Sequence, residues 1–182
     1  MEADWEVEIG GDAPVLDAAW SGFIDLRQTH AEAHTLDEVK NFPPLGAVLV
    51  RLNSNRSPVW TAKCDFWQLD EFDPFELDAP LLPGQYALAC YIDLFARNRA
   101  EWSSPQQAMD WCRALCLLLH QLPLRNSRAD LVIRAAYLPG DEAGFGVTAY
   151  LIAVGADEPG ARAQLTKALV AFADSIDALA SR

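Results

Sequence analysis

Basic residues are scarce in this 182-residue chain, which has 14 lysines and arginines against 26 aspartates and glutamates and a net charge of −12. The acidic excess lies in residues 1–80, which hold 16 acidic and 5 basic residues. Such a surface repels phosphate backbones and anionic lipid, so we expect neither a nucleic-acid partner nor a membrane partner. A basic protein or a cation is compatible with this charge, as is a charge that only keeps the protein soluble.

Long apolar runs are missing as well, because no uncharged apolar stretch approaches the roughly 18 residues that mark a membrane-spanning helix. The acidic segment Met1–Trp5 also lacks the basic and apolar regions of a signal peptide. The cysteines form no C-x-x-C pair and lie within apolar patterns, at Cys64, Cys90, Cys112 and Cys116. Buried, reduced thiols are typical of the cytoplasm, which is the location that we expect.

The motifs of common catalytic and nucleotide-binding sites are absent too. No G-x-G-x-x-G or P-loop follows a predicted strand, and neither G-x-S-x-G nor H-E-x-x-H occurs. Cys112, Cys116 and His120 share one helical face, but the first and last would lie roughly 12 Å apart, too far to bind one ion. The carboxylates of Asp70–Asp78 match no EF-hand spacing. We therefore expect no cofactor, no metal site and no identifiable catalytic residue.

What the chain does contain is a series of strand and helix patterns. Alternating apolar and polar residues predict strands at 5–9, 57–67, 86–95, 131–138 and 145–155. Helical spacing predicts helices at 12–24, 45–52, 104–122 and 157–179, with a strand over 22–27 as an alternative to the first. Capping boxes are predicted at Thr35 and Ser104, and Asp73 before Pro74 favours a further short helix.

The order of these elements indicates the fold class. From residue 44 onward it is helix, strand, strand, helix, strand, strand, helix. Two hairpin-like strand pairs imply an α+β fold with a mainly antiparallel sheet of four or five strands and helices packed on one face. We expect residues 1–182 to form a single domain, in which 1–43 are an N-terminal strand and helix extension packed on a core of 44–182.

Strand parity predicts that one sheet face is polar. In Ser57–Trp67, the face expected to meet the core carries Trp60, Ala62, Cys64 and Phe66. The opposite face of the sheet collects Thr61, Lys63, Asp65, Trp67, Tyr91, Asp93, Arg134, Thr148 and Tyr150. We predict a ligand- or partner-binding face there, made of Lys63, Asp65, Trp67, Tyr91, Asp93, Arg134 and Tyr150. The alternatives are a subunit interface and a solvated face with pairs such as Lys63–Asp93 or Arg134–Asp65.

For function, we expect a non-enzymatic, dimer-forming domain that binds a second copy of itself and, in addition, a basic protein or a small molecule. In acidity and element order the chain is similar to the small acidic chaperones of type III secretion, and that resemblance implies an acidic, dimeric binding protein. One alternative is an enzyme that uses Lys63, Asp65, Tyr91 or Tyr150 for acid/base chemistry. Another is a subunit of a larger complex, with an exposed apolar patch around Trp5, Trp20 and Trp102.

Overall fold

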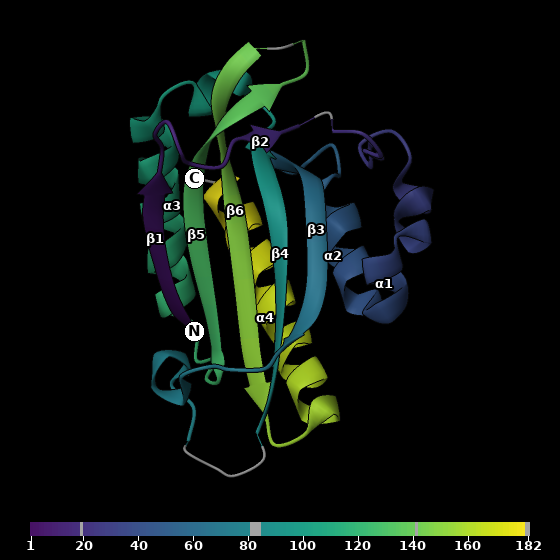
Figure 1. Cartoon of the computed structure of the whole chain (residues 1–182), viewed down its shortest axis with the longest axis vertical. Coiled ribbons are helices and arrows are strands. Elements are labelled where there is room, and N and C mark those ends of the chain that lie inside the picture. Colours follow the sequence, from purple (N-terminus) through teal and green to yellow (C-terminus); the bar gives the residue numbers. More distant parts are fainter. Residues whose placement is uncertain (19, 81–84, 141, 181–182) are drawn as a thin grey trace.

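One mainly antiparallel sheet organises the molecule in the computed structural model, which describes residues 1–18, 20–80, 85–140 and 142–180 (Figure 1). Its strands are β1 (Glu2–Glu8), β2 (Leu16–Asp17), β3 (Val59–Leu69), β4 (Tyr86–Ala96), β5 (Ser127–Leu138) and β6 (Glu142–Gly155). The helices are α1 (Asp37–Asn41), α2 (Pro43–Leu52), α3 (Pro105–His120) and α4 (Glu158–Ala180), with 3-10 turns η1 (His30–Thr35), η2 (Pro74–Leu77) and η3 (Arg99–Trp102). The predicted α+β class is confirmed.

The strand order is β1-β5-β6-β4-β3, and the two-residue β2 extends the sheet beside the end of β5. Neighbouring pairs are antiparallel from β3 to β5, whereas β1 and β2 run parallel to β5. The predicted hairpin between β5 and β6 is confirmed, and so is the pairing of β3 with β4. The N-terminal strand is therefore part of the same sheet as the central strands.

The helices cover one face of the sheet. In Figure 1, α3 and α4 lie behind the sheet, and α2 packs beside α4 at the β3 edge. Alternate residues of the central strands, such as Ile92, Leu131 and Leu151, are fully buried in the same core cluster as Leu165 and Phe172 of α4. Full burial of one such side chain contributes about 1.5–3 kcal/mol to folding. No helix in the described part of the chain is both long and apolar enough to cross a bilayer.

Only one of the two predicted capping boxes forms. At the start of α3, the Ser104 hydroxyl accepts from the Gln107 backbone N–H at 3.4 Å, and the Gln107 side-chain oxygen accepts from the Ser104 N–H at 3.0 Å. The box predicted at Thr35 is wrong, because α1 starts after Leu36 without any side-chain cap. The Thr35 hydroxyl instead donates to the Glu32 carbonyl at the end of η1.

Residues 10–18 and 20–29, here called the strap, cross the other face of the sheet, at its upper end in Figure 1. The helix predicted over 12–24 is wrong, and so is the alternative strand over 22–27, because the described part of the strap holds only β2, turns and extended chain; Ala19 lies outside the described residues. Gly22 has a φ of +96°, which is incompatible with a right-handed helix. Leu16 and Ala18 instead pack on the sheet with Trp60, Phe95 and Ala136.

A second segment, residues 70–80 with η2, crosses the same face at its lower end in Figure 1 and is here called the η2 crossing. Leu77 is buried there against Ala87 and Val154. The short helix predicted after Asp73 is confirmed, because the Asp73 carboxylate accepts from the Phe75 backbone N–H at 2.9 Å. The turn predicted at Pro80–Gly84 falls mostly on residues 81–84, which lie outside the described residues.

A β-bulge in β3 changes which face its first residues occupy. Thr61 is opposite Leu94 and Cys64 is opposite Ile92, so three steps on β3 match two on β4. One extra residue reverses strand parity. The prediction that Trp60 meets the helices and Thr61 the polar face is therefore wrong.

Each of these two side chains lies on the face that was predicted for the other. The Thr61 hydroxyl is buried and accepts from Nδ2 of Asn53, the C-cap of α2, at 2.7 Å, and the Thr61 N–H donates to Asn53 Oδ1 at 3.1 Å. Trp60 lies on the other face, where its ring stacks on Phe95 with 4.8 Å between centroids. Arg27 of the strap covers the same indole, with its guanidinium carbon 3.9 Å from the ring centroid.

Candidate binding site on the open sheet face

The sheet face opposite α3 and α4, here called the open face, brings most of the predicted site residues together. Strand register aligns one row of residues across five strands, made of Asp65 (β3), Tyr91 (β4), Tyr150 (β6), Asp130 (β5) and Asp4 (β1). The adjacent row on one side contains Trp67, and the row on the other side contains Asp93. Arg134 reaches this group from further along β5.

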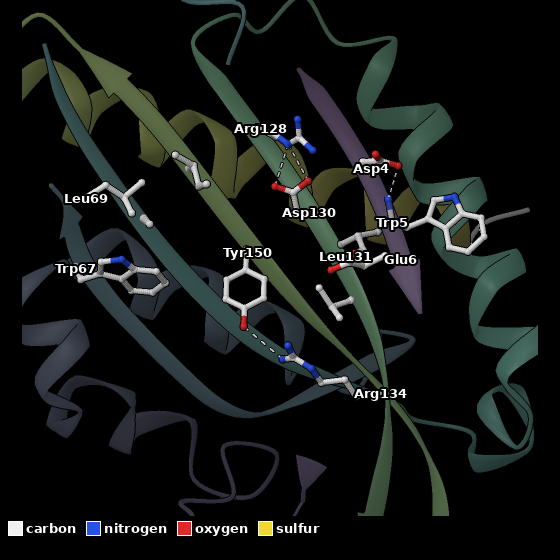
Figure 2. Close-up of a pocket in the computed structure, with 13 residues that line it drawn as sticks. Asp4, Trp5, Glu6, Trp67, Leu69, Arg128, Asp130, Leu131, Arg134 and Tyr150 are labelled. Atoms are coloured by element: carbon white, nitrogen blue, oxygen red, sulfur yellow. Dashed lines mark hydrogen bonds and ion pairs between the residues drawn. The ribbon is translucent and has the colours of Figure 1, made fainter. Parts of the chain in front are cut away.

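Between the strap and the η2 crossing, the open face is hollowed by about 380 Å³ (Figure 2). Residues of five strands line this hollow: Asp4, Trp5, Glu6, Trp67, Leu69, Ala89, Arg128, Asp130, Leu131, Val132, Arg134, Tyr150 and Ile152. The small Ala89 lies in register between the larger Trp67 and Ile152, which leaves space above it. This volume is within the range of small-molecule sites.

Aromatic rings form a ladder along one side of the hollow. The ring centroids of Trp67 and Tyr91 are 6.2 Å apart, and those of Tyr91 and Tyr150 are 5.9 Å apart, both in tilted geometry. Burial, followed by the nearby carboxylates of Asp93 and Asp65, raises the pKa of Tyr91 to about 12. The phenol of Tyr91 is therefore protonated at neutral pH.

Arg134 connects β5 to β1 on one side and to β6 on the other. Its Nε and Nη2 donate to Glu8 at 2.9 and 2.7 Å, while Nη1 donates to the Thr148 hydroxyl at 3.0 Å and to the Tyr150 hydroxyl at 3.3 Å. The predicted pair of Arg134 with Asp65 is wrong, because Glu8 takes that position. The sequence pattern did not reveal that β1 lies beside β5.

Asp93 and Lys63 lie away from the hollow lining. Asp93 is only 5% exposed and accepts from the Thr148 hydroxyl at 2.7 Å. Burial raises the pKa of Asp93, and the Thr148 hydrogen bond and the charges of Arg134 and Lys63 oppose this shift. Lys63 is in the bulge, with its ammonium 5.1 Å from the centroid of the Trp20 ring rather than within ion-pair distance of Asp93. The predicted Lys63–Asp93 pair is therefore a longer-range attraction only.

Arg128 and Asp130 are site residues that sequence analysis missed. The Arg128 Nε donates to both carboxylate oxygens of Asp130, at 2.7 and 2.9 Å. Burial, together with the charges of Asp4 and Glu76, raises the pKa of Asp130, whereas Arg128 opposes the shift. The strand was predicted to start at residue 131 but starts at Ser127. Continuing the alternation backwards from Arg134 would have found both residues.

Negative charge dominates the hollow and a smaller one of about 190 Å³ that adjoins it beneath the η2 crossing. Six carboxylates line the two hollows, against the guanidinium groups of Arg128 and Arg134. Each guanidinium is already bound to a carboxylate, whereas Asp4 and Glu6 take part in no ion pair with the residues that the structure describes. An excess of one sign of charge raises the local concentration of oppositely charged ligands.

The thiols and histidines offer no comparable site. Burial raises the pKa of Cys64 and Cys116 to about 12 and raises the pKa of Cys90 and Cys112 as well. His120 accepts from the Ala3 backbone N–H at 3.3 Å. Within the described ranges, no three His, Cys, Asp or Glu side chains are placed to hold a metal ion.

The tryptophan patch predicted for a subunit of a larger complex is wrong. Trp102 is buried against Trp111, with 4.9 Å between ring centroids. Trp5 and Trp20 are partly covered by Arg113 of α3 and by Lys63, respectively. These indoles are used in packing rather than gathered at one exposed surface.

Comparison with known proteins adds no further constraint. No protein-family model matches this chain, and no curated protein or solved structure is detectably similar to it. The resemblance to secretion chaperones in element order stays a prediction. The site is therefore interpreted from its own geometry.

Proposed function

We propose that this protein is a non-catalytic binding domain and that its ligand occupies the hollow on the open face. The observation that carries the proposal is a space of about 380 Å³ lined by aromatic, aliphatic and charged side chains from five strands. Side chains on strands are held more firmly than those on loops, and such positioning favours selective binding. The strap and the η2 crossing pack on other parts of the same sheet face.

The pKa values and contacts of the ionisable side chains on the open face favour binding over acid/base catalysis. Catalytic acids and bases have pKa values near the working pH. The pKa of Tyr91 is raised to about 12, which leaves it a poor base at neutral pH. Asp93 is buried and bonded to Thr148, and the Lys63 ammonium lies over the Trp20 ring. Of the four residues that the enzyme alternative names, only Tyr150 lines the hollow.

The polarity of the hollow also favours a ligand over a second copy of the chain at this place. The buried core of a homodimer interface is apolar and poor in charged residues. Here Asp4, Glu6 and Asp130 lie among the lining residues. The predicted homodimer and basic protein partner stay predictions, which light scattering and affinity measurements would test.

Ligand retention tests the proposal directly. Native mass spectrometry of the purified wild-type protein, together with a thermal-shift screen of anionic, neutral and cationic small molecules, should identify a bound compound. Trp67→Ala should weaken binding of that compound, whereas Phe75→Ala, which removes an exposed aromatic ring outside the lining, should preserve it. The proposal fails if the wild-type protein retains no compound and responds to none, or if binding is the same in Trp67→Ala.

A further inference from the structure

We propose that the ligand of the hollow is a linear aliphatic polyamine, which lies across the strands with its ammonium groups near carboxylates at both sides of the aromatic ladder. This inference rests on the proposed binding function and specifies its ligand class. Three properties of the open face lead to it: carboxylates that form no ion pair with a described residue, half-buried aromatic rings, and the separation of the acidic groups.

The charge pattern selects a cation. Both guanidinium groups of the hollow are used internally, Arg128 by Asp130 and Arg134 by Glu8. An anionic ligand would have to displace these carboxylates and would then meet Asp4 and Glu6. An ammonium group meets the same two carboxylates without breaking any existing pair.

The aromatic ladder suits an alkylammonium chain. Trp67 and Tyr150 line the hollow, and Tyr91 lies in contact with both rings. Cations bind over the faces of tryptophan and tyrosine, and methylene groups pack on the same surfaces. Ala89 and Ile152 lie in the same cross-strand row as Trp67, beside the row of the two tyrosines, and provide an apolar floor.

The separation of the acidic groups selects a long, multiply charged chain. In the row Asp65–Tyr91–Tyr150–Asp130–Asp4, the outer carboxylates lie on β3 at one side and on β5 and β1 at the other. Interstrand spacings of about 4.8 Å put Asp65 roughly 14 Å from Asp130 and 19 Å from Asp4. A compact monovalent cation would satisfy one side only. A metal ion would find no three suitable ligands together within the described part of the chain.

Titration calorimetry with matched probes tests the inference. Spermidine and octane-1,8-diamine should bind to the wild-type protein, and octane-1,8-diol should bind at least about tenfold more weakly because it lacks both charges. Asp65→Asn and Asp4→Asn should each weaken spermidine binding about three- to tenfold. Trp67→Ala should weaken it about tenfold. Asp12→Asn, an isosteric loss of an exposed charge outside the hollow lining, should leave affinity unchanged.

The outcomes separate this inference from the proposed function. It is overturned if spermidine and the diamine do not bind, if diol and diamine bind equally, or if Asp12→Asn and Asp65→Asn weaken binding equally. A trilysine peptide that binds more tightly than spermidine assigns the site to basic peptides and also overturns it. A neutral or anionic compound that binds in a Trp67-dependent manner would leave the proposed function intact. Unchanged thermal unfolding midpoints of the variants would show that they are folded.

Discussion

The guanidinium of Arg134 holds the carboxylate of Glu8 through two hydrogen bonds of 2.9 and 2.7 Å, although the residues are 126 positions apart in the chain. The pair joins β5 to the parallel N-terminal strand β1. Nη1 of Arg134 donates to the Thr148 hydroxyl, which in turn donates to Asp93. The first strand of the chain is thereby connected to the most buried carboxyl group of the open face.

Removing Glu8 should loosen β1. Glu8→Gln leaves a guanidinium, 14% exposed, without its counter-charge, so we expect the free energy of unfolding to fall by about 1–2 kcal/mol. Urea unfolding measures the loss, and amide hydrogen exchange should accelerate along β1. Glu2→Gln, on the same strand and in no ion pair with a described residue, should change stability by less than about 0.5 kcal/mol. Equal losses in the two variants would contradict the role of the pair.

The buried Asp93 should make stability depend on pH. Burial raises its pKa in the folded state, so the native protein binds more protons than the unfolded chain in the window above the ordinary carboxyl pKa. The free energy of unfolding therefore falls as pH rises through that window. Asp93→Asn, which keeps an oxygen acceptor for Thr148, should remove this contribution. Its stability relative to the wild type should be higher at about pH 7.5 than at about pH 4.

Urea unfolding of both proteins at the two pH values measures this difference. Asp65→Asn, which changes an exposed carboxyl group on the same face, serves as the control, with an expected effect below about 0.5 kcal/mol. If the free energies of unfolding of wild type and Asp93→Asn differ by the same amount at both pH values, the pKa of Asp93 is the same in the folded and unfolded protein.

Ser104 and Thr35, the two residues predicted to cap helices, should contribute differently to the free energy of unfolding. Ser104→Ala removes the hydroxyl that caps α3 and should cost about 1 kcal/mol. Thr35→Ala should cost less, because the Thr35 hydroxyl bonds back to Glu32 and caps no helix. Denaturant unfolding of both variants measures the contrast. A larger loss for Thr35→Ala would contradict the assigned cap.

The cysteines should be unreactive in the folded protein. The pKa of Cys64 and that of Cys116 are raised to about 12 by burial, so the reactive thiolate is rare at about pH 8. We expect slow modification of the native protein by an aromatic disulfide reagent and rapid modification of all four thiols after unfolding in urea. A single fast-reacting thiol in the native protein would show that its surroundings lower the pKa instead.

Much of the open face could be predicted from strand alternation alone. Asp65 and Trp67 on β3, Tyr91 and Asp93 on β4, and Arg134 and Tyr150 on β5 and β6 all share that face. Alternation is reliable within an uninterrupted strand because successive side chains point to opposite faces. It failed at Trp60 and Thr61 because a bulge is a property of strand pairing, and one strand's sequence does not show where its partner lacks a residue.

The strap shows a different limit of sequence analysis. Leu16, Trp20 and Phe23 recur at helical spacing, yet the segment is extended across the sheet. Its apolar side chains are buried against Trp60 and Phe95, which come much later in the chain. Tertiary burial overrides weak helical propensity, and Gly22 with its positive φ removes what remained of it.

The sequence by itself determined the element types from residue 44 onward, the cap of α3 and the polar character of one sheet face, because these depend on residues within a few positions of one another. Only the tertiary structure decided that β1 lies beside β5, that the strap and the η2 crossing bound one face, and that a hollow remains between them. Those features depend on contacts between different elements, some of them far apart in the chain, such as Glu8 with Arg134. Local periodicity carries no information about such pairings.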